Sequence, residues 1–338
     1  MKANKDQAYD IIGDIHGHAD KLESLLSILG YTPEEHWFTH PHGRKALFLG
    51  DYIDRGPAIR RTLDIVRGMI DAGNALGILG NHEVNALCYH QNGEDGNPLR
   101  KHTDGNIKQH KATLEQVANI DPEYWEETLD WFRALPLWIN IGNIRAVHAY
   151  WNDNDARRLD PVRSPQQGQS TIAELGRFLG EPRLSDNHLM RISQKNHDEY
   201  GQAVDRLLCG PELALSHNEF FETDDRKKRN SIRYRWWEDC AGKNYRQMVF
   251  PPVATEKISD AAITDCPTEG AYPDHAPLTF FGHYALPPGA DPICLPNLAC
   301  LDLGCGKGGE LIAYSWDGEQ TIDPTKFTEL SPLGTSRI

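Results

Sequence analysis

The chain has 338 residues, of which 39% are hydrophobic and 25% are charged, and its formal net charge is −14. This length and composition suit a globular protein of one or two domains with a sizeable core. The acidic balance disfavours non-specific binding to DNA and to anionic membranes. An anionic substrate is not excluded, because bound metal ions reverse the local field around them.

The cysteine pattern favours a reducing compartment. The seven cysteines are odd in number and include no Cys-x-x-Cys pair, which predicts free thiols rather than a disulfide framework. The N-terminal segment lacks a secretory signal pattern, and no apolar run is long enough to span a bilayer. We therefore expect a cytoplasmic protein with no membrane partner and no stable nucleic-acid complex.

Three strand–loop–helix units open the chain. Short apolar runs at 9–12, 46–49 and 75–79 predict buried strands, and a helical stretch follows each of them. The first two helical stretches carry aliphatic residues at the spacing of one helix face. This alternation is typical of an α/β fold, in which the ligand site lies beyond the carboxyl ends of the strands.

Further elements follow these units. The polar segment 92–106 is expected to be a loop, and 122–134 is expected to be a helix with proline near its start. Two apolar runs, 137–141 and 144–149, flank Gly142-Asn143 and predict a β-hairpin. Core strands are expected again at 278–281, 299–303 and 311–316.

Residues 151–276 differ from the rest of the chain. They are polar, are interrupted by proline and glycine, and contain a charged cluster at 224–235. We interpret them as a cap or insertion. The basic residues of the cluster form either a solvated face or a surface that recruits a polyanionic substrate. Residues 319–338 are expected to be a C-terminal tail, loosely held after about Pro324.

Each of the first three strands ends in a glycine followed by a polar residue. The segments are Gly13-Asp14-Ile15-His16-Gly17, Gly50-Asp51-Tyr52-Ile53-Asp54-Arg55-Gly56 and Gly80-Asn81-His82-Glu83. Glycine permits the backbone angles that a loop around an ion needs. Carboxylate, imidazole and amide ligands without a thiolate favour Mn, Fe, Zn or Co ions. Two such ions that share a carboxylate typically lie about 3.5–4 Å apart in phosphoester hydrolases.

These segments resemble the motifs GDxHG, GDxxDRG and GNHE of the calcineurin-like metallophosphoesterases, in the family's order. More narrowly, they resemble the phosphoprotein-phosphatase branch, including bacterial Ser/Thr phosphatases and diadenosine tetraphosphatase-type enzymes. The resemblance covers 8–150 and 277–318, which we assign to the core. It implies an α/β fold, the αββα sandwich of two mixed β-sheets flanked by helices, with 151–276 as a cap insertion.

The resemblance also implies a set of metal ligands. Two divalent transition-metal ions would be held, manganese first and iron or zinc as alternatives, with Asp51 bridging them. The implied ligands are Asp14, His16, Asp51, Asn81, His148 and His283.

The remaining implied roles concern the substrate. Arg55 would hold a phosphate oxygen, a task that its planar guanidinium suits, next to Asn81. His82, paired with Asp54, would protonate the leaving-group oxygen. The nucleophile would be a metal-bridging hydroxide that attacks phosphorus in line. A second phosphate-binding arginine has no clean motif, and Arg233 or Arg235 is our candidate.

Three functions are compatible with these residues. A phosphomonoesterase of the Ser/Thr protein phosphatase type is favoured by Gly50-Asp51-Tyr52 and by Glu83. The alternative is a dinucleoside polyphosphate hydrolase acting on diadenosine tetraphosphate, favoured by His18 after the first motif and by the cap. An inactive metal-binding scaffold is a further alternative, against which the complete ligand set argues. The substrate is thus a phosphorylated small molecule, a nucleotide or a phosphoprotein.

A glycine-rich segment at 301–309 fits the G-x-G-x-x-G pattern of nucleotide-binding folds. That pattern requires a following helix inside a βαβ unit. Residues 310–316 instead have the character of a strand, and the chain ends at Ile338. We therefore expect a glycine-rich turn behind the metal site and no cofactor site of the methyltransferase kind.

Overall fold

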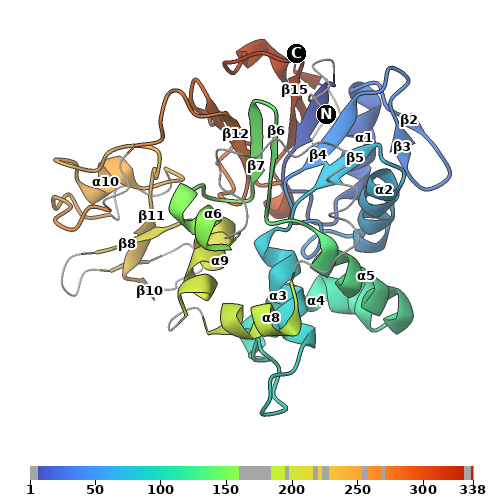
Figure 1. Cartoon of the computed structure of the whole chain (residues 1–338), viewed down its shortest axis with the longest axis horizontal. Coiled ribbons are helices and arrows are strands. Elements are labelled where there is room, and N and C mark those ends of the chain that lie inside the picture. Colours follow the sequence, from blue (N-terminus) through green and yellow to red (C-terminus); the bar gives the residue numbers. More distant parts are fainter. Residues whose placement is uncertain are drawn as a thin grey trace.

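The computed structural model describes most of the chain, and two mixed β-sheets form its centre (Figure 1). The described residues are 7–159, 184–194, 198–215, 220–222, 228–252, 258–267, 271–330 and 336–337.

The first sheet has six strands, in the order β17-β16-β15-β1-β4-β5. Strands β1, β4 and β5 are parallel to one another, and β15 runs antiparallel to β1. These strands are β1 (Tyr9–Ile12), β4 (Lys45–Phe48), β5 (Ala75–Gly77), β15 (Leu311–Trp316), β16 (Phe327–Leu330) and β17 (Ser336–Arg337). The three parallel strands bring their carboxyl ends to one edge.

The second sheet has five strands, in the order β13-β14-β12-β7-β6. Strand β12 is parallel to both β7 and β14, while β6 and β7 form the predicted hairpin. These strands are β6 (Trp138–Ile141), β7 (Ile144–Val147), β12 (Leu278–Phe281), β13 (Ile293–Leu295) and β14 (Leu298–Cys300). Here too, three strands end at a common edge.

Alternation along the strands divides the core into two layers. Ile11 and Leu47 belong to the apolar cluster that also contains Phe280 of the second sheet. Ile12 and Phe48 belong to the cluster on the opposite face, with the helices of the first half of the chain. The two mixed sheets therefore pack against each other with helices outside, which confirms the predicted sandwich.

The helices of this half lie beside the six-stranded sheet and beyond its edge (Figure 1). The predicted helix at 122–134 is present with the predicted bounds, because Asp121 caps it and Pro122 starts it. The helices are α1 (Ala19–Ile28), α2 (Ile59–Asp71), α3 (Asn81–His90), α4 (Asp104–Thr113), the π-helix η1 (Leu114–Ala118) and α5 (Pro122–Ala134). A short ribbon of β2 (Thr32–Pro33) and β3 (Phe38–Thr39) joins α1 to β4.

Helix α4 corrects the prediction of a loop over 92–106. It begins at Asp104, where the Thr103 side chain accepts a hydrogen bond from the Asn106 N–H and caps the helix. The polar sequence and Gly105 hide this start, since its apolar positions are few. The helix matters because it carries His110 and Thr113 toward the site described below.

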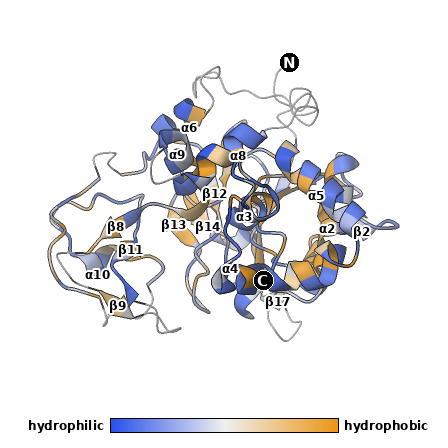
Figure 2. Cartoon of the chain, turned by 90° about the horizontal axis from the view of Figure 1, so that it is seen from below, coloured by the Kyte–Doolittle hydropathy of each residue, from blue (hydrophilic) through white to orange (hydrophobic). Residues whose placement is uncertain are grey.

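The segment between β7 and β12 contributes no strand to the two large sheets among its described residues. Its strands form two-stranded ribbons, and Figure 2 shows them to one side of the molecule. Its elements are α6 (Asp153–Leu159), α8 (Asp186–Ser193), α9 (Glu199–Cys209), β8 (Glu212–Ala214), β9 (Phe221–Glu222), β10 (Lys228–Arg229), β11 (Ser231–Arg233) and α10 (Tyr245–Met248). Residues 224–227 of the predicted charged cluster lie outside the described residues, while Lys228 and Arg229 are exposed.

Two expectations are corrected elsewhere. Strand β16 pairs with β15 after the 3-10 turn η5 (Pro324–Lys326), so residues 327–330 extend the first sheet instead of belonging to a loosely held tail. Cys240 and Cys266 are joined in a disulfide, so these two cysteines are not free thiols. In the described part of the chain, no helix is both long and apolar enough to cross a membrane. The cytoplasmic location stays a prediction.

Candidate metal centre

Polar side chains follow the carboxyl ends of strands from both sheets. Asp14 follows β1, Asp51 follows β4 and Asn81 follows β5 in the first sheet. In the second sheet, His148 follows β7 and His283 follows β12. The two edges meet, since the Gly282 N–H donates to the His148 carbonyl and the His283 N–H donates to Asp14 Oδ2 at 3.0 Å. All six predicted ligands are thereby brought to one place.

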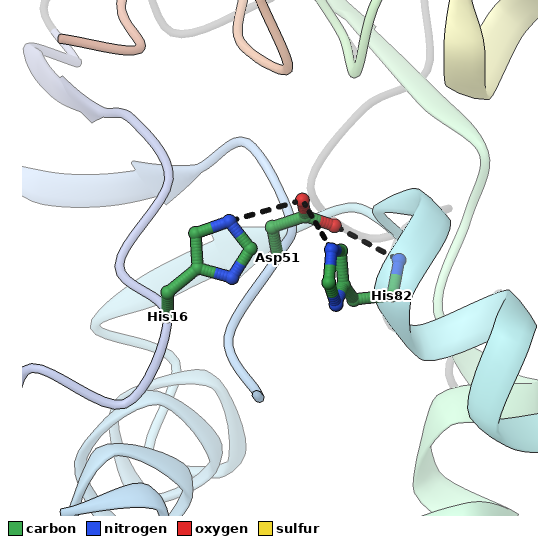
Figure 3. A group of neighbouring side chains, drawn as sticks. All are labelled: His16, Asp51 and His82. Carbon is green, nitrogen blue, oxygen red and sulfur yellow. Dashed lines mark hydrogen bonds and ion pairs between the residues drawn. The ribbon is translucent and has the colours of Figure 1, made fainter. Parts of the chain in front are cut away.

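Asp51 lies at the middle of this group. Its Oδ2 is 3.4 Å from His16 Nε2, and its Oδ1 is 3.4 Å from His148 Nε2. Figure 3 shows His16 and His82 on either side of the Asp51 carboxylate. The two oxygens of one buried carboxylate thus face two separate imidazoles, which is the arrangement that a bridging ligand requires.

Backbone carbonyls orient two of the imidazoles. His16 Nδ1 donates to the Ile53 carbonyl at 2.9 Å, and His148 Nδ1 donates to the Leu49 carbonyl at 2.7 Å. Metal-binding histidines commonly donate their second ring nitrogen to such an acceptor, which fixes the tautomer and the ring plane. Each ring therefore directs its Nε2 toward Asp51.

Unpartnered buried atoms support the fit to cations. Asp14 Oδ1 and His283 Nε2 are buried without a hydrogen-bond partner. Asn81 Oδ1 lies 2.8 Å from His283 Nδ1 and 3.2 Å from His148 Nε2. A buried carboxylate oxygen without a partner is costly unless a cation or donor reaches it. Carboxylate, imidazole and amide atoms together form a donor set that suits divalent transition metals.

Two groups of ligand atoms lie close enough together to hold an ion. One consists of Asp51, His148 and His283, and the other of His16, Asp51 and His82. The second group contains His82, whereas the predicted third ligand beside His16 and Asp51 is Asp14. His82 Nδ1 is already bound to Asp54 at 2.5 Å, and its Nε2 is 3.9 Å from Asp51. This engagement favours His82 as a proton donor and leaves Asp14 as the proposed ligand.

The electrostatics of the centre favour added positive charge. Burial lowers the pKa of His16 to about 3, although Asp51 opposes this effect, so its ring is neutral and ready to bind a cation. For His148, burial also favours the neutral ring, but the Asp51 carboxylate outweighs it and raises the pKa to about 10. The same Asp51 charge that raises this pKa also favours a cation bound beside the two side chains.

The loops that carry these side chains have unusual backbone angles. His16, Asp51, Asp54, Arg55 and His283 have φ values of 48°, 53°, 67°, 69° and 74°. Side-chain-bearing residues rarely adopt this left-handed region, and such strain persists only where the surroundings enforce it. Among the described residues, five of the six non-glycine residues with this conformation are predicted site residues, which favours loops held for the site rather than for stability.

Glu83 enforces part of this backbone. Its buried carboxylate accepts N–H groups from Asp51 and Tyr52 at 2.8 Å each and from Gly80 at 2.9 Å. One side chain thus ties the loop after β4 to the start of α3. The motif contained Glu83, but only the structure shows that it holds the backbone of Asp51.

A second chain of hydrogen bonds orients His82. Asp54 Oδ2 lies 2.5 Å from His82 Nδ1, while Asp54 Oδ1 accepts from His110 Nδ1 at 2.8 Å and from the Thr113 hydroxyl at 2.6 Å. Burial opposes protonation of His82, but Asp51 and Asp54 together raise its pKa above the ordinary value. The exposed Arg55 side chain places Nη2 3.4 Å from His82 Nε2.

The glycine-rich segment lies directly behind the site. It forms the 3-10 turn η4 (Cys305–Lys307) and is followed by strand β15, as predicted, and not by a helix. A Cβ atom at Gly306 would lie 2.5 Å from His16 Cδ2 and 2.8 Å from Arg55 Cδ. Close packing, and not phosphate binding, therefore explains this glycine.

The structure separates the two candidate arginines of the insertion. Arg233 Cζ lies 5.9 Å from the centre of the Tyr284 ring, next to His283 in the chain, and its charge adds to burial in lowering the pKa of His283. Arg235 instead donates to Glu238 Oε1 at 3.2 Å. The geometry thus favours Arg233 as the second phosphate-binding arginine.

Sequence reasoning missed three residues that support the site. His110 and Thr113 hold Asp54 from helix α4, which the sequence analysis did not predict and which carries no motif. The buried Asp302 accepts N–H groups from Ala285 at 2.6 Å and Gly304 at 2.9 Å and so fixes the turn after His283. A signal existed only for Asp302, which follows an apolar strand as the other site residues do.

One family model, several curated proteins and several solved structures match this chain. The family model described as calcineurin-like phosphoesterase matches residues 9–293. The symmetrical bis(5'-nucleosyl)-tetraphosphatase of Janthinobacterium sp. is 26% identical over 318 residues, which are 92% of this chain and 93% of that protein. The asymmetrical bis(5'-nucleosyl)-tetraphosphatase PrpE of Anoxybacillus flavithermus is 43% identical over 74 residues, 22% of this chain, and the match spans only 30% of its length. A solved cold-active protein-tyrosine phosphatase of a Shewanella species is 13% identical with a TM-score of 0.44, covering 98% of this chain and 80% of that one.

Proposed function

Because the chain belongs to the calcineurin-like phosphoesterase family, we propose that it hydrolyses phosphoric ester or anhydride bonds at the centre around Asp51. The observation that carries this proposal is the Asp51 carboxylate, whose two oxygens each lie 3.4 Å from a separate imidazole nitrogen. We propose Asp14, His16 and Asp51 as ligands of one ion, and Asp51, Asn81, His148 and His283 as ligands of the other. Manganese is the first candidate metal, with iron or zinc as alternatives.

When bound, two divalent ions supply Lewis acidity, which acidifies water and offsets the charge of the phosphate. The residues of the chain supply the rest. The exposed guanidinium of Arg55 suits two phosphate oxygens at once. A phosphate held by Arg55 also lies beside His82, because Nη2 of Arg55 is 3.4 Å from His82 Nε2.

His82 acts on the departing group in this proposal. A hydroxide, formed when water gives up a proton to solvent, forms a bond to phosphorus through its oxygen while the bond to the leaving oxygen breaks. His82 Nε2 gives its proton to that leaving oxygen, and Asp54 stabilises the protonated ring from Nδ1. His110 and Thr113 act through Asp54 and are positioning residues.

The first substrate class that we propose is the dinucleoside polyphosphates. The relative that supports it, named as a symmetrical bis(5'-nucleosyl)-tetraphosphatase, matches over 93% of its length. This reverses the order of the two alternatives drawn from the sequence. The phosphomonoesterase of the Ser/Thr protein phosphatase type is the second candidate, supported by Glu83 of α3, whose carboxylate accepts N–H groups of the loop after β4.

A substrate panel tests the proposal. Purified protein with added manganese is assayed with diadenosine tetraphosphate, a phosphoserine peptide and p-nitrophenyl phosphate. We expect turnover of diadenosine tetraphosphate with a kcat/KM above that for the phosphopeptide. Turnover of the phosphopeptide alone would support the second candidate, and no turnover of any substrate by metal-loaded protein would support an inactive scaffold.

A further inference from the structure

One arginine near His82 has no role in the site described so far. Arg100 is half-buried, and its backbone N–H donates to the Cys88 carbonyl at 2.8 Å, which fixes the residue against α3. Its guanidinium donates from Nη1 to Asn85 Oδ1 at 2.7 Å and from Nη2 to Gln109 Oε1 at 2.8 Å. Both acceptors are neutral, so neither balances the positive charge.

The two acceptors of Arg100 lie beside His82. Asn85 follows His82 by three residues on α3, so both side chains emerge from the same face of that helix. The Nε2 atom of Gln109 lies 3.5 Å from His82 Nε2. Gln109 therefore spans the space between Arg100 and the atom that carries the proposed proton. The Arg55 guanidinium lies near the same nitrogen, at 3.4 Å.

Arg100 also lacks the charge partner that similar arginines have. In the described part of the chain, no carboxylate lies within ion-pair distance of its guanidinium. By contrast, the half-buried Arg133 lies 2.9 Å from Asp186 Oδ1. Burial lowers the pKa of Arg100, an effect that the more distant Asp54 charge partly offsets. An unbalanced half-buried cation is unfavourable alone and becomes favourable when an anion binds beside it.

The position of His82 indicates where that anion belongs. His82 serves the oxygen that leaves, so groups beside it contact the departing part of the substrate. In a phosphate monoester this oxygen is attached to carbon, whereas in a phosphoanhydride it is attached to a second phosphorus with anionic oxygens. The guanidinium has five N–H donors, and two account for the bonds to Asn85 and Gln109. Donors remain for such a phosphate.

We propose that Arg100, held by Asn85 and Gln109, binds the phosphate of the leaving group and so selects phosphoanhydrides, such as nucleoside polyphosphates, over phosphate monoesters. This inference rests on the proposed function and names the residue that sets its substrate class. Arg55 and the metal ligands act on the phosphate that is attacked, and Arg100 acts on the phosphate that departs.

The test compares two substrates in one pair of variants. The kcat/KM values for diadenosine tetraphosphate and for p-nitrophenyl phosphate are measured with manganese in the wild type, Arg100→Met and Arg100→Lys. We expect Arg100→Met to lower the ratio of the two values by about tenfold or more, the size of one lost charge-assisted hydrogen bond. Arg100→Lys restores part of the ratio, because it keeps the charge but not the planar fork.

Arg133→Met is the matched control, since it removes a similar arginine that already has a carboxylate partner, and its ratio should equal that of the wild type. An unchanged ratio in Arg100→Met, or an equal loss on both substrates in both Arg100 variants, would overturn the inference. These outcomes leave the proposed function intact if the wild type hydrolyses diadenosine tetraphosphate. A wild type that hydrolyses only p-nitrophenyl phosphate would overturn the proposed anhydride substrate and this inference together.

Discussion

Polar side chains are held differently in two regions of the molecule: at the carboxyl edge of the two sheets, and in the segment between β7 and β12. At the edge, Asp51 and His148 are buried, follow strands of the large sheets, and are held by backbone groups or by each other. In the inserted segment, Arg233 ends a three-residue strand that pairs with β8 in a two-stranded ribbon. The ion pair of Asp155 with Arg206 joins helices α6 and α9 there.

This difference indicates a division of work. A metal site requires ligands fixed to within fractions of an ångström, which strand ends in a packed core provide. Contacts with the distal part of a substrate tolerate more variation, and short ribbons and helices outside the sheets supply them. We propose that residues 151–276 form an insertion that modulates substrate binding, while 8–150 and 277–318 carry the chemistry. Changes at the edge should therefore affect turnover, and changes in the insertion should affect KM or stability.

The largest effect is expected from Asp51→Asn. Asparagine keeps the shape of the side chain and an oxygen that accepts the backbone N–H of His82, whose nitrogen lies 3.0 Å from Asp51 Oδ1. It loses the negative charge that both proposed metal positions share. We expect kcat for p-nitrophenyl phosphate to fall about a thousandfold or more, because removing even one group that stabilises developing charge has an effect of that order. Metal content and the melting temperature are measured alongside. Retained turnover with both metals bound would contradict the assignment.

A somewhat smaller effect, dependent on the substrate, is expected from His82→Asn. A proton donor matters most when the leaving oxygen is basic, and general acids typically contribute about a hundredfold or more. We therefore expect a loss of about a hundredfold for phenyl phosphate and a much smaller loss for 2,4-dinitrophenyl phosphate. His110→Gln, which acts through Asp54, should show the same dependence at lower amplitude. Equal losses across the aryl phosphates would indicate that His82 is instead a metal ligand.

In the insertion, the pair Arg233→Ala and Arg235→Ala separates the two candidates for phosphate binding. Arg233 lies near His283, whereas Arg235 is bound to Glu238. We expect Arg233→Ala to raise KM for diadenosine tetraphosphate about tenfold, the loss of one charge-assisted hydrogen bond. Arg235→Ala should leave KM unchanged. Steady-state kinetics of both variants measure this KM. A raised KM in Arg235→Ala with an unchanged KM in Arg233→Ala would identify Arg235 as the phosphate-binding residue instead.

The smallest effect on activity is expected from Asp155→Asn. Asp155 is buried and accepts from Arg206 Nε at 2.7 Å and Nη2 at 2.6 Å. Breaking a buried pair on one side costs about 3 kcal/mol of unfolding free energy, so thermal or urea unfolding should show a clear loss while kcat is nearly unchanged. Arg158→Met removes a more exposed partner of Asp155, 3.6 Å away, and should cost under about 1 kcal/mol. A large fall in kcat for Asp155→Asn would contradict the division, because it would show that the insertion contributes to the chemical step.

The same division explains what the sequence predicted. The six proposed metal ligands lie on or near the ends of short apolar strands, so local pattern and motif were enough to predict that their side chains lie together. Glu83 was visible, but its bonds to the N–H groups of Asp51 and Tyr52 are not, because they join residues about 30 positions apart. His110 reaches Asp54 across 56 residues from a polar helix with no apolar pattern.

Other features had no local signal at all. The disulfide between Cys240 and Cys266 depends on how the insertion folds, which its irregular sequence does not determine. The pairing of β16 with β15 likewise depends on a neighbouring strand and not on the sequence of β16 itself. Arg233 and Arg235 are two residues apart in one basic run, and only their contacts distinguish them.

The most direct test of the centre is anomalous diffraction from crystals of the protein loaded with manganese. We expect two anomalous peaks, one on each side of the Asp51 carboxylate. One should lie beside Asp14 and His16, and the other beside Asn81, His148 and His283. A single peak would contradict the two-metal centre. A peak bound by His82 Nε2, with Asp14 outside its coordination distance, would contradict the role of His82, because that histidine would then have no free nitrogen to protonate the leaving group.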